Sequence, residues 1–192
     1  MTIIDHQLLN KDFNNPHWEI KHLFIGTFNP TGGHPVKYFY GRESNYFWKV
    51  ISNIFSDDLN PIISDSTDKF IKKLQNHQIA CLDLINSVEF DEAKVDIQNI
   101  IGKGYSDSKI INKKVKRNYN AKFINKIIEK NPNIKVYTTW GNGSNFREWK
   151  DEINKLPKDI IKLVSPSRVA RVPLGVKKFE YILKNWKQNI KF

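Results

Sequence analysis

An asparagine near the amino terminus stands where a buried strand should end. Residues 23–25 form a short apolar run, and Gly26, Asn29 and Pro30 follow it. An apolar run that stops at glycine and proline is typical of a core strand that leads into a turn. Ligands of open α/β sheets bind just outside the carboxyl ends of such strands. Asn29 therefore stands where an amide side chain could take part in chemistry.

Two further polar segments accompany apolar runs elsewhere in the chain. Asp83 stands near the end of the run 79–85, and the run 160–164 leads directly into Ser165-Pro166-Ser167-Arg168-Val169-Ala170-Arg171. The carboxyl ends of parallel strands meet at one edge of a sheet. We therefore expect three polar loops to converge at that edge.

The predicted elements alternate between strands and helices. We expect strands over residues 23–27, 79–85, 134–140 and 160–164, and helices over 45–55, 67–77, 121–130, 145–156 and 174–186. Such alternation is typical of a parallel sheet covered by helices on both faces. The sequence thus predicts an α/β fold, a three-layer α/β/α arrangement with a short, mainly parallel central sheet.

Residues 86–119 are polar and basic, and they end in Lys113-Lys114-Val115-Lys116-Arg117. A charge run of this kind is most simply a solvated loop or helix face, and phosphate contact is the alternative.

The composition favours one domain that binds nucleic acid. With 192 residues, of which 40% are hydrophobic, the chain can bury one sizeable core, and we expect a single domain over residues 1–192. Lys and Arg number 31 against 20 Asp and Glu, which gives a net charge of +11. That charge is the electrostatic footprint of a nucleic-acid binder, although compositional bias toward lysine is the alternative explanation.

The single cysteine and the amino terminus indicate a cytoplasmic protein. Cys81 alone cannot form an intramolecular disulfide, a cysteine metal cage or an iron–sulfur cluster. The amino terminus lacks a basic stretch followed by an apolar one, and no window approaches about 18 apolar residues. We therefore expect neither a signal peptide nor a membrane span.

The order and spacing of the motifs resemble the uracil-DNA glycosylase superfamily. Its mismatch-specific branch has Gly-x-Asn-Pro after the first strand, an aromatic residue and Asn-x-Phe-Trp before the next helix, and an Asn-Pro-Ser-type loop near the carboxyl terminus. The matching positions here are Gly26, Asn29, Pro30, Tyr40, Asn45, Phe47, Trp48, Pro166, Ser167 and Arg171. Segments 79–85, 104–110 and 131–137 are similar to the hypoxanthine-DNA glycosylase-like branch, so the resemblance covers most of residues 20–186.

Three departures separate this chain from the superfamily pattern. Thr31-Gly32-Gly33 follows Pro30 in place of the Gly-Leu of the mismatch branch. Ser165 replaces the usual Asn or His of the second motif, which removes an imidazole or an amide from beside the leaving base. The four cluster-binding cysteines of the thermophilic branches are absent, so neither a metal nor a cofactor is expected.

The resemblance implies an enzyme that flips a nucleotide out of DNA and hydrolyses its N-glycosidic bond. A deaminated base, uracil or hypoxanthine, is the expected substrate, DNA the expected partner and a monomer the expected state. One alternative is a relative that acts on another nucleobase or on free nucleosides. The other is a catalytically silent nucleic-acid-binding module.

Asn29 and Ser167 are the catalytic positions that the resemblance implies. Asn29 matches the family's water-positioning residue, whose side-chain carbonyl would accept a hydrogen bond from the water. The alternative for Asn29 is an Asx turn before Pro30. Ser167 and its neighbouring backbone could hold a phosphate, or could form a simple surface turn.

Phe28, Tyr40, Asp83 and Asn45 are the implied base-binding positions. Tyr40 would stack on the extruded base, with ordinary packing as the alternative. Asp83 can only accept hydrogen bonds when ionised, so it would favour a base that presents N–H donors; a buried structural carboxylate is equally compatible with the sequence. Asn45 is also a good helix cap, which is the interpretation that we favour.

Pro166, Arg168, Val169, Arg171 and Gly141 are the implied DNA-contacting positions. Arg168, Val169 and Arg171 would form a wedge that fills the space left by the flipped nucleotide. Gly141 follows the third predicted strand, where a glycine permits either close approach to DNA or a turn.

Overall fold

The computed structural model describes residues 1–9, 11–61, 66–140 and 147–191. Its strands are β1 (Thr2–Asp5), β2 (His22–Gly26), β3 (Ile79–Asp83), β4 (Ile85–Phe90), β5 (Val115–Tyr119), β6 (Lys135–Thr138) and β7 (Ile160–Lys162). Its α-helices are α1 (Phe47–Ile54), α2 (Thr67–Asn76), α3 (Gln98–Ile101), α4 (Ala121–Lys130), α5 (Arg147–Ile153) and α6 (Lys178–Asn189).

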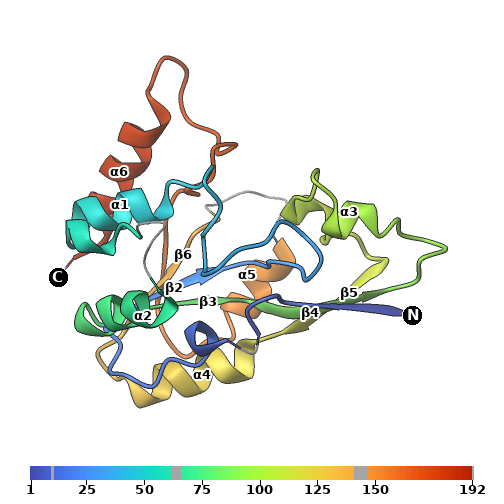
Figure 1. Cartoon of the computed structure of the whole chain (residues 1–192), viewed down its shortest axis with the longest axis horizontal. Coiled ribbons are helices and arrows are strands. Elements are labelled where there is room, and N and C mark those ends of the chain that lie inside the picture. Colours follow the sequence, from blue (N-terminus) through green and yellow to red (C-terminus); the bar gives the residue numbers. More distant parts are fainter. Residues whose placement is uncertain (10, 62–65, 141–146, 192) are drawn as a thin grey trace.

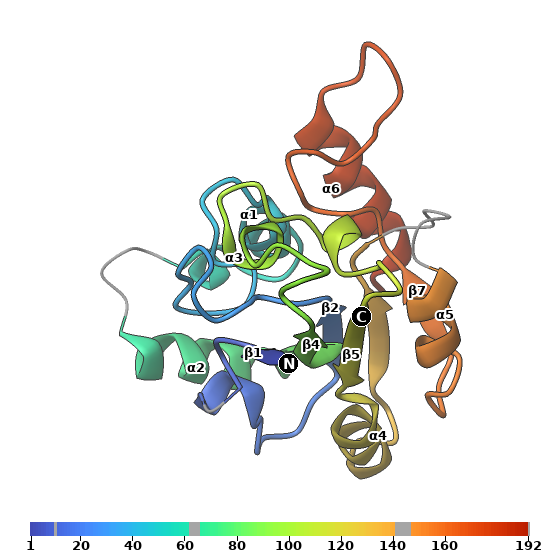
Figure 2. The same cartoon turned by 90° about the vertical axis from the view of Figure 1, so that its right-hand side faces the viewer.

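The central sheet is parallel and has the strand order β3-β2-β6-β7. Every residue of β2 and β3 is buried, as expected of strands covered on both faces. Helices α1 and α6 lie on one side of this sheet and α4 lies on the other (Figure 1, and Figure 2 after a quarter turn). The predicted α/β fold is therefore confirmed.

Aromatic rings join β2 to the helices on one face. Phe24 of β2 stacks on Tyr137 of β6, with ring centroids 4.8 Å apart, and on Trp186 of α6 at 5.8 Å. Phe47 of α1 meets the ring of Phe24 edge-on at 5.4 Å. Aromatic pairs at these separations each contribute about 0.5–1.5 kcal/mol beyond the burial of their area. The cluster therefore fixes the start of α1, and with it the polar loop that precedes the helix.

A second sheet, antiparallel with the order β1-β4-β5, was not expected from the sequence. The run 79–85 was expected to be one strand, but β3 ends at Asp83 and β4 begins at Ile85. Between them the chain crosses the end of β2, where Leu84 N–H donates to Gly26 O and Ile85 N–H to Thr27 O. The apolar run 79–85 therefore contains strand β3 of the parallel sheet and the first residue of strand β4 of the antiparallel sheet.

The expectation of a loop or helix face over residues 86–119 was wrong for its two ends, which form β4 and β5. In β5, Val115 is buried while Lys116 is exposed, and Lys116 Nζ donates to Glu89 Oε2 at 2.9 Å. Arg117 Nη1 donates to the carbonyl oxygen of Ile110 at 2.8 Å, and Nη2 contacts Glu148. Part of the basic run thus has partners within the protein.

The last helix also differs from its expected bounds, since α6 begins at Lys178 and not at residue 174. Pro173 and Gly175 precede it, and Gly175 has φ +78°, a left-handed conformation that a helix does not accommodate. Leu174 is consequently fully exposed in the loop between β7 and α6. Among the described helices, none is long and apolar enough to cross a membrane.

We expect Gly26→Ala to lower the free energy of unfolding by about 1–3 kcal/mol, the usual cost of overpacking. An added Cβ would lie 2.2 Å from Asp83 Oδ1 and 2.8 Å from the hydroxyl oxygen of Tyr40. Urea denaturation measures the loss. The matched control is Gly104→Ala, where nothing lies within 4 Å of the added Cβ. Equal stability of Gly26→Ala and the wild type would contradict this close packing.

Candidate functional site

Polar residues gather at the carboxyl edge of the parallel sheet. Gly26 of β2 lies beside Asp83 of β3 in register, and Thr139 N–H, just after β6, donates to Ile25 O at 3.2 Å. The loop after β7 reaches the start of α1, where Tyr46 N–H donates to Pro166 O at 2.8 Å. The expected convergence of the loops that contain Asn29 and Asp83 is confirmed by this register.

Asp83 is the centre of the hydrogen bonds at this edge. Its side chain is buried, and Oδ2 accepts from Asn29 Nδ2 at 2.9 Å and from His6 Nε2 at 2.7 Å. The main-chain carbonyl oxygen of Asp83 accepts from Asn120 Nδ2 at 3.2 Å. A carboxylate removed from water needs such donors to offset its lost hydration.

His6 was not among the site residues predicted from the sequence, although it contacts Asp83 directly. The segment after β1 pairs with the Asn29 loop, because Gln7 N–H donates to Asn29 O at 2.9 Å and Thr31 N–H to Asp5 O at 2.8 Å. The imidazole packs against the rings of Phe28 and Phe39, with centroids 5.8 and 5.6 Å away. No local pattern identifies this histidine, since its partner is 77 residues away along the chain.

Tyr40, the expected base-stacking residue, and Phe28, an expected base-binding residue, both pack against other side chains of the protein. Tyr40 has φ +57°, its ring stacks on Phe47 at 3.8 Å, and its hydroxyl hydrogen-bonds Thr139 Oγ1 at 2.8 Å. Burial raises the pKa of Tyr40, so the phenol stays protonated. Phe28 is buried against His6.

A second carboxyl group, that of the half-buried Asp107, lies beside the same loop, and the sequence analysis did not identify it as a site residue. Thr27 Oγ1 donates to Asp107 Oδ2 at 2.8 Å, and the Tyr105 hydroxyl donates to Oδ1 at 3.1 Å. The guanidinium of Arg42 lies over the Tyr105 ring, 5.8 Å from its centroid. Burial raises the pKa of Asp107 to about 6, and the negative charge of Asp83 acts in the same direction. In the sequence, segment 104–110 indicates only a similarity to the hypoxanthine-DNA glycosylase-like branch and gives no role to Asp107.

Asn45 and Ser167 meet at an isolated antiparallel bridge. Asn45 Oδ1 accepts from the N–H of Phe47, the first residue of α1, at 2.9 Å, although the N-cap position itself is Tyr46 and not Asn45. Ser167 Oγ accepts from Val169 N–H at 3.3 Å, and its carbonyl oxygen accepts from Ala170 N–H at 3.0 Å, as in a turn.

The expected DNA-contacting residues differ in exposure. Pro166 is buried, whereas Arg168, Val169 and Arg171 are exposed. Gly141 lies outside the described residues.

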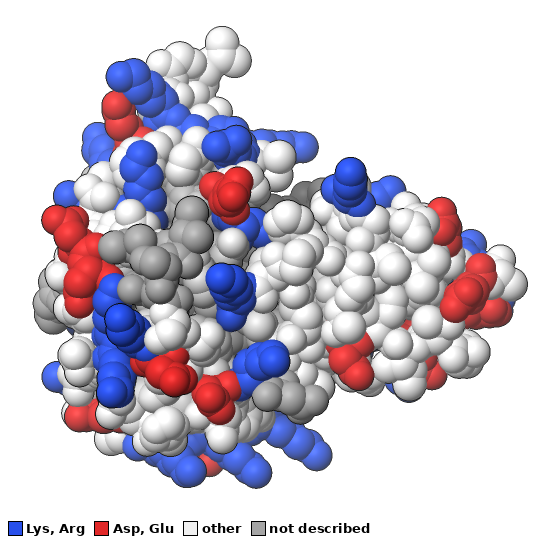
Figure 3. All heavy atoms as spheres, in the orientation of Figure 1, with Lys and Arg blue, Asp and Glu red and all other residues white. Residues whose placement is uncertain are grey.

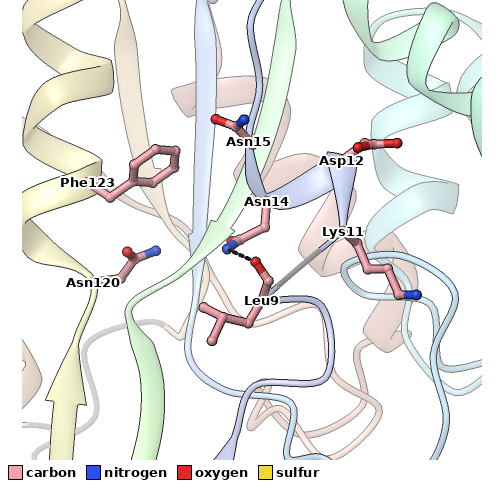
Figure 4. Close-up of a pocket in the computed structure, with 7 residues that line it drawn as sticks. All are labelled: Leu9, Lys11, Asp12, Asn14, Asn15, Asn120 and Phe123. Carbon is pink, nitrogen blue, oxygen red and sulfur yellow. Dashed lines mark hydrogen bonds between the residues drawn. The ribbon is translucent and has the colours of Figure 1, made fainter.

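A hollow of about 540 Å³ lies away from this edge, between the amino-terminal segment and α4 (Figure 4). Its lining residues are Leu9, Lys11, Asp12, Asn14, Asn15, Asn120 and Phe123. Two of these residues bond residues of the site: Asn120 Nδ2 donates to the main-chain carbonyl oxygen of Asp83, and Leu9 N–H donates to that of His6 at 3.0 Å. Over the described part of the chain, no three His, Cys, Asp or Glu side chains are arranged to hold a metal ion.

We expect Asp107→Asn to stabilise the protein at pH 8 and not at pH 3.5. A carboxyl group whose folded pKa exceeds its value of 3.8 in the unfolded chain stabilises the fold only while protonated, and this contribution is lost as the pH rises through about 6. The amide cannot ionise, so we expect a gain in the free energy of unfolding of about 1–3 kcal/mol at pH 8. Urea denaturation at the two pH values measures it. Asp151→Asn, at an exposed position of α5, is the control. A gain of equal size at both pH values would show that ionisation of Asp107 is not its cause.

Comparison with known proteins gives a structural match and no sequence match. No family model matches the chain, and no curated protein does. Among solved structures, it is similar to the solution NMR structure of a "putative Uracil DNA glycosylase" from Methanosarcina acetivorans, with a TM-score of 0.53. The alignment covers 88% of this chain and 91% of that chain at 15% identity. This chain therefore has the fold of the Methanosarcina protein.

Proposed function

We propose that the protein is a DNA glycosylase that hydrolyses the N-glycosidic bond of a deaminated base, uracil or hypoxanthine, in DNA. The shared fold with the Methanosarcina protein supports this function, because that protein is described as a "putative Uracil DNA glycosylase". The observation that carries the proposal is the 2.9 Å hydrogen bond from Asn29 Nδ2 to Asp83 Oδ2. It leaves the amide oxygen of Asn29 available to a different donor.

Hydrolysis of this bond needs a positioned water, a stabilised oxocarbenium-like sugar and an easy departure of the base. The amide oxygen of Asn29 would accept from the water and hold it beneath the sugar, a contribution of orientation and not of basicity. The carboxylate of Asp83 lies next to this amide, where its negative charge favours a positive charge that develops on the sugar.

The base would lie against the loop that contains Thr27 and Tyr40. Phe47 covers one face of the Tyr40 ring, so a base could stack only on the other face. Asp107, hydrogen-bonded to Thr27 and Tyr105, offers polar groups to the edge of the base. Asp83 is a weaker candidate for recognising the base than the sequence indicated, because its Oδ2 already accepts hydrogen bonds from His6 and Asn29.

The loop between β7 and α6 is the proposed DNA wedge. It projects from the body of the molecule (Figure 1). Val169 is 86% exposed, and the basic side chains of Arg168 and Arg171 flank it. Exposed apolar side chains among basic ones are typical of groups inserted between bases. Elsewhere, on the face in Figure 3, Lys and Arg are interspersed with Asp and Glu, so the net charge is not gathered into one patch there.

We expect Asn29→Ala to lower the single-turnover rate of base release by about 100-fold or more, because one lost positioned dipole commonly costs a few kcal/mol of barrier. Oligonucleotides that carry uracil or hypoxanthine, single-stranded and in duplex, serve as substrates. Alkaline cleavage at the abasic product measures the rate.

The control for Asn29→Ala is Asn53→Ala, since Asn53 is exposed and its Nδ2 donates to Lys49 O within its own helix. An unchanged rate in Asn29→Ala would remove this residue from the mechanism. No release from any substrate by the wild type, with DNA binding intact, would favour the silent nucleic-acid-binding module.

We expect the affinity for DNA to fall steeply as the salt concentration rises. In the double variant Arg168→Ala and Arg171→Ala, the affinity should depend less steeply on the salt concentration. Each phosphate contact that is lost should reduce the slope of log K against log salt by about 0.9 on duplex DNA. Fluorescence anisotropy from 50 to 200 mM salt measures both quantities. Lys130→Ala, at the exposed end of α4 on the opposite side of the sheet, should match the wild type. Equal slopes for all three proteins would show that the DNA-binding surface does not include the β7–α6 loop.

A further inference from the structure

We propose that His6 and Asp83 form a positioning pair that holds the side-chain amide of Asn29 with its oxygen directed away from Asp83. This inference rests on the proposed function for its catalytic consequence. The orientation of the amide itself is a property of the protein alone, and it can be tested without DNA.

The hydrogen bonds around His6 fix which of its nitrogens carries the proton. Leu8 N–H donates to His6 Nδ1 at 3.0 Å, and a backbone N–H can only donate. A neutral imidazole that accepts at Nδ1 bears its proton on Nε2. His6 therefore donates from Nε2 to Asp83 Oδ2, across 2.7 Å.

The same reasoning extends from Asp83 to Asn29. An ionised carboxylate has no proton to donate, so the atom of Asn29 that faces Oδ2 at 2.9 Å must be the nitrogen. Turning the amide by 180° would bring its oxygen against the carboxylate oxygen and would break the bond. One network of hydrogen bonds, in which Leu8 donates to His6 and His6 donates to Asp83, thus selects one of the two amide orientations of Asn29.

Packing prevents the pair from relaxing into another arrangement. His6 is 4% exposed and lies between the rings of Phe28 and Phe39. Asp83 Oδ1 packs closely against Gly26, because a Cβ at that position would lie only 2.2 Å from this oxygen. The backbone hydrogen bond from Gln7 N–H to Asn29 O holds the His6 segment beside the Asn29 loop. Positioning residues of this kind act through the geometry of another residue, and small displacements cost catalysis heavily.

The direct experiment observes the Asn29 side-chain NH₂ group by ¹H–¹⁵N NMR, with its signals assigned by their loss in Asn29→Ala. We expect two well-separated proton signals and slow solvent exchange in the wild type. In Asp83→Ala and in His6→Phe the exchange should become at least tenfold faster. His6→Gln, which restores an N–H donor near the place of Nε2, should recover most of the protection. The exposed side chain of Asn53 gives the reference behaviour.

The kinetic experiment separates positioning from general support. His6→Phe should lower the single-turnover rate by roughly 10- to 100-fold with an unchanged dissociation constant for DNA. In the Asn29→Ala background the same substitution should cost less than about twofold, because no amide is left to orient. Thermal denaturation verifies that each variant is folded at the assay temperature.

Three results would overturn the positioning pair. Unchanged NMR signals of Asn29 in folded Asp83→Ala or His6→Phe would remove the pair from its proposed role. Losses that multiply in the double variant would show a purely structural effect. In Asp83→Asn, a changed ranking of substrates with an undisturbed Asn29 amide would make Asp83 a reader of the base. An inactive wild type with a protected Asn29 amide would reject the proposed function alone and leave the positioning pair standing.

Discussion

The burial of one carboxyl group, that of Asp83, constrains the whole carboxyl edge of the sheet. Removed from water, this group requires nearby donors, and they come from segments far apart in the sequence. His6 lies beyond β1, Asn29 follows β2, and Asn120, which bonds the main chain of the same residue, precedes α4. The crossing from β3 to β4 takes place immediately after Asp83. The two sheets and the site are thus joined at a single residue, and a change there affects all of them.

The parallel sheet and its edge could be predicted because their signals are local. The strands β2, β3, β6 and β7 lie within apolar runs bounded by turn residues, and the register of parallel strands then brings Gly26 and Asp83 together. Asn29 could be singled out for the same reason. The role proposed for Asn29 depends on its position near a strand end, and that position can be inferred from a short stretch of sequence.

The antiparallel sheet and the two missed site residues depend on partners that no local pattern reveals. Strand β5 contains one fully buried residue, Val115, among charged and polar ones, so it reads as a basic surface segment. His6 and Asp107 gain their significance from contacts with Asp83 and Thr27, which are 77 and 80 residues away. Isolated acidic residues and histidines are common on protein surfaces, and only the fold distinguishes these two.

The pairing of β1 with β4 brings the segment that contains His6 to the site. The imidazole of His6 reaches Asp83 only when the amino-terminal segment is in place beside β4. Completion of the site therefore depends on the pairing of β1 with β4. A chain whose first residues are displaced, by a bulky fusion for example, would retain the parallel sheet around Phe24 while the amide of Asn29 lost its fixed orientation.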